Sequence, residues 1–293
     1  MDQSTLPRRQ LVWFITGTSS GFGYRLVLSA LARGDLVIAT ARDFEKLQDL
    51  YGREERENLR LLQLDITAGF DVIKTIVDKA LILWGRIDVL VNNAGNGYLS
   101  FVEEATSDLF RRQFDTNVFG VMDVTNAVLP YMREKKDGTV IVVGSRSVWR
   151  ADMLSGLGPY AASKAAIHAV TEALSVELAS FNVKVLLVVP GAFRTEKMYS
   201  IPFNEANPIP DYDDVRKSVM SQIAKIPGNE PGDPVKAMEV VVDIVRGEGV
   251  AKGKEWPGTI LLGEDAEATY RKKETKLNQA IQEWIQVTKS VAF

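Results

Sequence analysis

The sequence predicts an α/β fold, a single doubly wound parallel sheet of about seven strands with helices on both faces. Short apolar runs alternate along the chain with segments of helical spacing, which is the pattern of repeated strand–helix–strand units. Each run is almost continuously apolar instead of alternating, as expected for strands buried on both faces. Polar or glycine-containing motifs follow several of these runs, at the strand ends where such sheets bind ligands.

The strands are expected at the apolar runs, which are residues 11–16, 36–40, 59–64, 87–91, 139–143, 183–189 and 259–262. The segment 69–84 has helical periodicity, with one apolar stripe made by Val72, Ile73, Ile76, Val77 and Ala80. Helices are also expected over residues 24–32, 107–133 and 160–181. A polar amphipathic helix over 265–289 has an apolar face of Leu277, Ile281, Trp284 and Ile285. We expect this helix to pack on the rim of the domain or on a partner subunit.

The length of 293 residues and the 46% hydrophobic content suit one large domain over residues 1–293. Residues 11–195 form its predicted cofactor-binding and catalytic core. Residues 196–257 are rich in proline and acidic side chains at their start, which predicts a loop and helices that cap a substrate pocket. Residues 258–293 hold the last strand and the C-terminal helix.

Composition excludes several classes of protein. A net charge of −3 without a long basic run argues against a nucleic-acid partner. The absence of cysteine excludes disulfides, thiolate catalysis and cysteine-bound zinc, and a single histidine, His168, argues against a site with several histidine ligands, so no metal is expected. No apolar run is long enough to span a bilayer, and residues 1–10 do not resemble a signal peptide. We therefore expect a cytoplasmic enzyme.

A glycine-rich turn directly follows the first strand. Its residues include Gly17, Ser19, Ser20, Gly21, Phe22 and Gly23, in the spacing Gly-x-x-x-Gly-x-Gly. Glycines allow backbone amides to approach a pyrophosphate, and the following helix N-terminus adds partial positive charge. The turn therefore predicts a dinucleotide site, with an ordinary glycine turn before a helix as the alternative.

The ends of the second and third strands bear on the choice of cofactor. Arg42 takes the position from which an arginine can pair with the 2′-phosphate of NADP, so NADP(H) is favoured over NAD(H). In the alternative interpretation, Arg42 is a solvated charge and Asp43 caps the next helix. Asp65, after the third strand, is a candidate acceptor for the adenine amino group, or else a cap for helix 69–84.

Tyr160 and Lys164 are the strongest catalytic candidates. Residues four apart lie on one face of a helix, so the phenol and the ammonium project into the same site. A nearby cation favours the phenolate and so lowers the pKa of a tyrosine, which makes it a better acid and base near neutral pH.

Two further motifs make the pattern specific, namely Asn92-Asn93-Ala94-Gly95 after the fourth strand and Pro190-Gly191 after the sixth. With the glycine turn and the Tyr160–Lys164 pair, they occur in the order found in the classical short-chain dehydrogenase/reductase family, which this chain resembles over residues 11–195. The resemblance implies that Tyr160 exchanges a proton with the substrate oxygen, and that Lys164 lowers the pKa of Tyr160 and bonds the nicotinamide ribose.

The resemblance assigns further roles. Ser145 would hydrogen-bond the substrate oxygen, and Asn117 would hold a proton-relay water through its helix. Asn93 would lie against the adenosine half of the cofactor, and Phe193 and Thr195 would contact the nicotinamide end. The remaining residues of the implied cofactor site are Ala94, Gly95, Pro190 and Gly191.

One spacing departs from the family pattern. The family serine usually stands about thirteen residues before the tyrosine, which fits Ser147, whereas Ser145 stands fifteen before it. Ser145 is preferred because the alignment up to it needs no gap, and two extra residues in the loop 146–159 cost little. Ser147 remains the alternative. His168 is expected to be a packed helical residue.

The same loop carries Trp149, Arg150 and Met153, and exposed aromatic side chains there suggest a sizeable, partly apolar substrate, with a loop that only covers the surface as the alternative. We therefore expect an NADP(H)-dependent oxidoreductase that reduces a ketone or aldehyde of medium size, with carbonyl reduction as the physiological direction. The alternatives are an NAD-linked alcohol dehydrogenase and a non-redox use of the scaffold, as an isomerase, a cyclase or a dinucleotide sensor. Family resemblance also implies a homodimer or homotetramer formed through helices 107–133 and 160–181.

Overall fold

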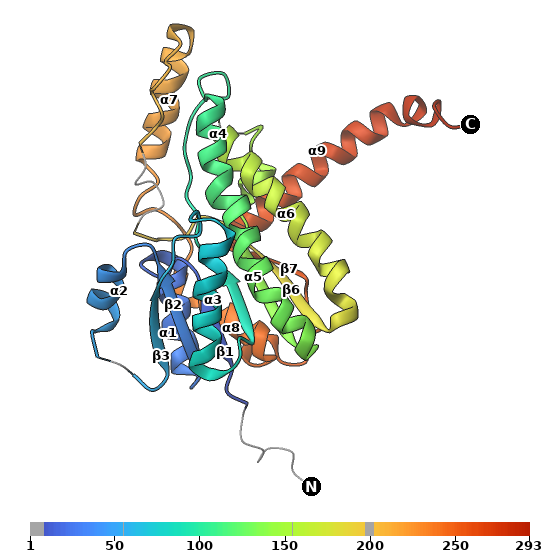
Figure 1. The fold of residues 1–293 in the computed structure, drawn as a ribbon. Coiled ribbons are helices and arrows are strands. Elements are labelled where there is room, and N and C mark those ends of the chain that lie inside the picture. The colour runs from blue at the N-terminus through green and yellow to red at the C-terminus, as the bar shows by residue number, and fades with distance from the viewer. Residues whose placement is uncertain (1–8, 55, 154, 197–201) are drawn as a thin grey trace.

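The computed structural model describes residues 9–54, 56–153, 155–196 and 202–293, so part of the predicted capping segment, 197–201, lies outside the described residues. The predicted sheet is confirmed. Its strands, all parallel, run in the order β3-β2-β1-β4-β5-β6-β7, so the chain reverses its direction of winding between β1 and β4 (Figure 1). The strands are β1 (Val12–Ile15), β2 (Leu36–Ala41), β3 (Leu59–Gln63), β4 (Val89–Asn92), β5 (Gly138–Val143), β6 (Val183–Pro190) and β7 (Thr259–Leu262).

Helices cover both faces of the sheet, which explains why the strands read as continuous apolar runs. One face packs against helices that include α3, where Ile73 and Val77 are buried, and α5, where Val128 is buried. The other face packs against α1 and α8, through residues such as Val27 and Val241. The helices are α1 (Gly21–Ala32), α2 (Phe44–Tyr51), α3 (Phe70–Trp84), α4 (Ser107–Phe114), α5 (Gly120–Lys135), α6 (Gly158–Leu178), α7 (Asp213–Ala224), α8 (Pro234–Arg246) and α9 (Glu264–Lys289).

The helix expected over residues 107–133 is interrupted. A π-helical turn, Asp115–Phe119, separates α4 from α5, so one extra residue is accommodated at that point. Such turns are rare and often occur at functional sites. Its second and third residues are Thr116 and Asn117, and Asn117 is one of the predicted site residues.

The predicted capping segment, 196–257, divides into two parts. Helix α8 packs on α1 as part of the layer that covers the sheet. The described chain before α8, through α7, contributes to a separate cluster, and its capping of a substrate pocket stays a prediction. Phe203 and Val219 pack there with Phe101, and Arg216 on α7 forms a buried ion pair with Glu104. Figure 1 shows α7 in orange, rising beyond the body of the sheet.

Helix α9 is only partly packed. Ala266 and Thr269 in its first turns are buried, whereas Leu277, Ile281 and Trp284 farther along are more than half exposed. The helix projects away from the sheet toward the C-terminus (Figure 1). The expected packing on the rim of the domain therefore holds for the first turns of α9. No helix of the described ranges is both long enough and apolar enough to cross a membrane.

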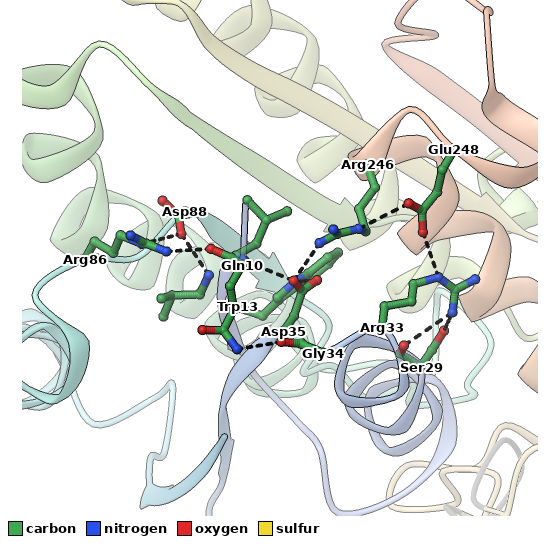
Figure 2. Close-up of polar contacts among 12 residues, drawn as sticks. Gln10, Trp13, Ser29, Arg33, Gly34, Asp35, Arg86, Asp88, Arg246 and Glu248 are labelled. Carbon is green, nitrogen blue, oxygen red and sulfur yellow. Dashed lines mark hydrogen bonds and ion pairs between the residues drawn. The ribbon is translucent and has the colours of Figure 1, made fainter. Parts of the chain in front are cut away.

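Buried aspartates hold the amino ends of the strands together (Figure 2). Asp35, fully buried before β2, accepts hydrogen bonds from Leu11 N at 3.0 Å, Trp13 Nε1 at 2.9 Å and Arg246 Nη1 at 2.6 Å. Asp88, before β4, accepts hydrogen bonds from Val12 N at 2.8 Å and from Arg86 Nε at 2.9 Å. These contacts fix β1 against its neighbours at the end of the sheet opposite the predicted site.

Candidate active site

The glycine turn after β1 is pressed against the loop that follows β4. The Asn93 side chain donates to Thr16 O and Gly17 O, both at 3.0 Å, and an added Cβ on Gly17 would lie 2.7 Å from Ala94 Cα. Gly23 has no room for a side chain, because an added Cβ would clash with Gly17 O and would lie only 2.5 Å from Asn93 Nδ2. Two of the three glycines are therefore required by this close packing, and the amide of Asn93 serves to hold the turn.

The carboxylate of Glu196 occupies the N-terminus of α1. The helix begins at Gly21, beside the half-buried Ser19 and Ser20, and the Gly21 amide donates to the Glu196 carboxylate at 2.9 Å. Free amides at a helix N-terminus bind negative groups, which is the property that the predicted pyrophosphate site needs.

The residues after β6 lie beside this turn. An added Cβ on Gly21 would lie 3.9 Å from the Thr195 side chain, so Thr195 is adjacent to the turn, while its contact with the nicotinamide end stays a prediction. The Phe193 ring is 4% exposed and packs edge-on against Phe22, with ring centroids 5.2 Å apart. This ring therefore belongs to the core, and the contact of Phe193 with the nicotinamide stays a prediction.

The ends of β2 and β3 place the cofactor-selecting candidates. Arg42 is exposed directly after β2, and Asp43 caps α2 by accepting from Lys46 N at 3.0 Å. Asp65 accepts from Thr67 N at 2.9 Å and from its hydroxyl at 2.7 Å, whereas the N-cap of α3 is Gly69. Asp43 is thus a helix cap, and Asp65 closes a local turn and does not cap α3.

Lys164 reaches from α6 to the carboxyl end of β5. Its ammonium donates to Val143 O at 2.8 Å, and the side chain is only 7% exposed. Burial disfavours the charged form and lowers the pKa of Lys164 to about 8. An added Cβ on Gly95 would lie 3.6 Å from Lys164 Nζ and 3.2 Å from Asn117 Oδ1, so these two side chains converge on the same glycine.

Asn117 is held rigidly within its π-helical turn. Its amide donates to Asn96 O at 2.9 Å and to Ser163 Oγ at 3.0 Å, and its Oδ1 accepts from Asn96 N at 3.0 Å. These bonds join the loop after β4 to α6. The Asn117 side chain is therefore engaged by protein groups, and the relay water at its helix stays a prediction.

Tyr160 lies one helical turn before Lys164 on α6 and is half-buried. Its ring packs against the loop after β4, because an added Cβ on Gly97 would lie 3.2 Å from Tyr160 Cδ2. The same loop thus contacts Tyr160, Lys164 and Asn117, which brings three of the four predicted catalytic residues to one edge of the sheet.

Ser145 follows β5 and is buried. Its hydroxyl accepts from Ser147 N and donates to Ser147 Oγ, both at 3.1 Å, so the two candidate serines are neighbours. Its own amide donates to His168 Nε2 at 3.1 Å. Burial, and then the charge of Lys164, lower the pKa of His168 to about 4, so the imidazole stays neutral and can accept this bond.

Comparison with known proteins identifies the family of this chain. A family model described as short chain dehydrogenase matches residues 11–205. The chain belongs to the classical short-chain dehydrogenase/reductase family. It is similar to oxidoreductase BOA17 of Botryotinia fuckeliana (32% identical, covering 93% of this chain and 96% of that protein) and to the uncharacterized oxidoreductase YusZ of Bacillus subtilis (34% identical, covering 78% and 82%).

Solved structures agree as well. A short-chain dehydrogenase from Streptomyces avermitilis is 33% identical, with a TM-score of 0.83, and the match covers 97% of this chain and 100% of that chain. Structures that share the fold at 26% and 23% identity were solved with NADP+ and with NADH, respectively. The chain is thus a short-chain oxidoreductase of a family that uses nicotinamide cofactors.

Asp265, at the start of α9, contacts the catalytic half of the domain and was not predicted from the sequence. Asp265 Oδ2 accepts from Ala192 N at 2.8 Å and pairs with Arg146 Nη1 at 2.8 Å. Gly191 packs so closely on this carboxylate that no side chain fits there. One aspartate therefore links the loop after β6 to the loop that carries Ser145. The only signal in the sequence was its place directly after the last strand.

Trp149 differs from expectation. The interpretation as an exposed aromatic side chain is wrong, because its half-buried ring packs against His168 and Tyr270, at centroid distances of 6.0 and 5.0 Å. Met153 is exposed, and an open hollow of about 420 Å³ lies between it and α7, lined by Val215, Val219 and polar neighbours. Among the described residues of the loop 146–159, Met153 is the exposed large apolar side chain.

Proposed function

We propose that this chain is an NADP(H)-dependent oxidoreductase that transfers hydride between a nicotinamide and a carbonyl or secondary alcohol. The observation that carries the proposal is the meeting of Tyr160, Lys164 and Asn117 at the loop after β4, with a buried lysine of lowered pKa. Lowered lysine pKa values and convergent polar groups are typical of acid–base sites.

The residues at the glycine turn fit a dinucleotide. Gly17 and Gly23 have no room for side chains, and the Gly21 amide binds a carboxylate in the place where we expect a pyrophosphate. A bound nicotinamide supplies or accepts the hydride. Tyr160 gives a proton to the substrate oxygen or takes one from it, and Ser145 Oγ hydrogen-bonds that oxygen.

Lys164 favours the ionised phenol of Tyr160 through its positive charge. The Asn117 turn connects the site to a relay water, because the π-helical backbone departs from regular hydrogen bonding. In the reductive direction the proton leaves Tyr160 for the new alcohol, and this relay returns one.

The preference for NADP(H) rests on Arg42. Its guanidinium is exposed at the end of β2, and the neighbouring carboxylate of Asp43 is engaged in capping α2. An arginine with free donors can bind a 2′-phosphate through paired hydrogen bonds. An NAD-linked alcohol dehydrogenase is the alternative.

The proposed substrate is a partly apolar ketone or aldehyde of medium size. The hollow between Met153 and α7 supports this, since its apolar residues stand beside serine and glutamine side chains. We also propose self-association through α5 and α6, supported by Val176, which is exposed on α6. Sedimentation of the purified protein should then give a dimer or tetramer, and a monomer at micromolar concentration would contradict this.

Titration with NADPH and NADH, followed by tryptophan quenching and cofactor fluorescence, tests the proposal. We expect NADPH to bind more tightly, and Tyr160→Phe to bind it almost unchanged while losing turnover of any carbonyl substrate found. An active Tyr160→Phe variant would remove the phenol from the mechanism. Binding of neither cofactor would overturn the proposed function.

A further inference from the structure

The carboxylate of Glu196 occupies the anion position of the glycine turn. Its Oε2 accepts from Gly21 N at 2.9 Å and from Arg25 Nη1 at 2.9 Å, and its Oε1 pairs with Arg25 Nη2 at 2.5 Å. Glu196 comes from the loop after β6, 175 residues away in sequence from Gly21. An anion from one loop therefore satisfies both the helix N-terminus and an arginine one turn into α1.

We propose that Glu196 competes with the pyrophosphate of the dinucleotide for Gly21 and Arg25, and that Arg25 is a ligand of that pyrophosphate once Glu196 leaves. This inference rests on the proposed dinucleotide-binding function. Two negative groups cannot share one amide and one guanidinium without strong repulsion, so the pyrophosphate has to displace the carboxylate. Arginine binds phosphate as well as carboxylate through paired hydrogen bonds, so Arg25 is left with a partner after the exchange.

The charge on Glu196 persists under all ordinary conditions. The hydrogen bond from Arg25, followed by that from the Gly21 amide, holds the pKa of Glu196 at about 2. Its side chain is nevertheless 51% exposed, so the ion pair is accessible to solvent and salt and is weak enough to open. The contact is therefore a standing competitor that lowers cofactor affinity without preventing binding.

Glu196→Gln provides the sharpest test, because the amide oxygen can still accept from Gly21 and only the charge is lost. In this proposal the contact is closed in most molecules of the free protein, and the apparent affinity falls by the fraction that is open. We expect Glu196→Gln to bind NADPH about threefold to tenfold more tightly than the natural protein at low salt. The difference in NADPH affinity between the two proteins should become smaller as the salt concentration rises, because screening weakens the ion pair between Glu196 and Arg25.

Two further variants isolate the mechanism. Arg25→Gln in the Glu196→Gln background should lose the gain, because the arginine that receives the phosphate is gone. Glu267→Gln is the matched control, since Glu267 forms an exposed ion pair with Arg271 at 2.8 Å on α9. Its NADPH affinity should equal that of the natural protein. Circular dichroism of each variant checks that it is folded.

The outcomes separate this inference from the proposed function. If the natural protein binds NADPH and folded Glu196→Gln binds it no more tightly, Glu196 is not a competitor and the inference fails while the function stands. If the double variant keeps the gain, Arg25 is not the phosphate ligand. If neither protein binds NADPH or NADH, the proposed function and the inference fail together.

Discussion

Replacing Lys164 with methionine should change how the stability of the protein depends on pH. Burial lowers the pKa of Lys164 to about 8 in the folded protein, against an ordinary value of 10.5 in the unfolded chain. Between these values the unfolded state binds the proton and the folded state does not, so stability rises with pH. For this shift the gain from pH 7 to pH 9.5 is about 2 kcal/mol.

Urea unfolding at several pH values measures this gain. The free energy of unfolding of the natural protein should rise relative to Lys164→Met by about 2 kcal/mol over that range. Other groups that titrate in this range are common to both proteins and cancel in the difference. Lys79→Met, which removes an exposed lysine from α3, is the control and should run parallel to the natural protein. Parallel curves for Lys164→Met would show that the burial of Lys164 does not disfavour its charge, and the acid–base argument would lose its basis.

Four other substitutions test the site. Arg42→Asp should shift the NADPH/NADH affinity ratio toward NADH by more than a few-fold, since attraction to a 2′-phosphate becomes repulsion; an unchanged ratio would leave Arg42 a surface charge. Ser145→Ala and Ser147→Ala should differ sharply in kcat, with Ser145→Ala the more damaging, and the reverse order would move the role to Ser147. Asp265→Ala should lower the free energy of unfolding by about 1–3 kcal/mol, because Ala192 N loses its buried acceptor; equal stability in urea would contradict this.

The sheet was predictable because its signal is local. Strands such as β4 and β6 are almost continuously apolar, and the candidate ligand-binding motifs follow them directly, so the strand positions and the end of the sheet that carries the site could be inferred together. The glycine turn and the Tyr160–Lys164 pair are likewise defined by short spacing. In both motifs the residues that indicate a function lie within a few positions of one another, so the sequence alone reveals them.

Contacts between distant segments were not predictable in the same way. The bond from Ser145 N to His168, the link from Asp265 to Ala192, and the placement of Glu196 on Gly21 all join residues far apart in sequence. His168 could be recognised as a packed helical residue, but its acceptor role depends on Gly144, which leaves no space between strand and helix. The π-helical turn at Asn117 leaves the amphipathic pattern of 107–133 almost unchanged, so periodicity did not reveal it.

The aspartate network at the amino ends of the strands has a consequence for how variants of this enzyme are assessed. The ion pair between Asp35 and Arg246 stabilises the fold at the amino ends of the strands, whereas every proposed reacting group lies at their carboxyl ends. A substitution such as Arg246→Ala should reduce the amount of folded enzyme in cells, and each molecule that folds should keep its normal turnover. An assay on crude extract would score such a variant as catalytically dead, so activity has to be normalised to folded protein before any residue is assigned to the chemistry.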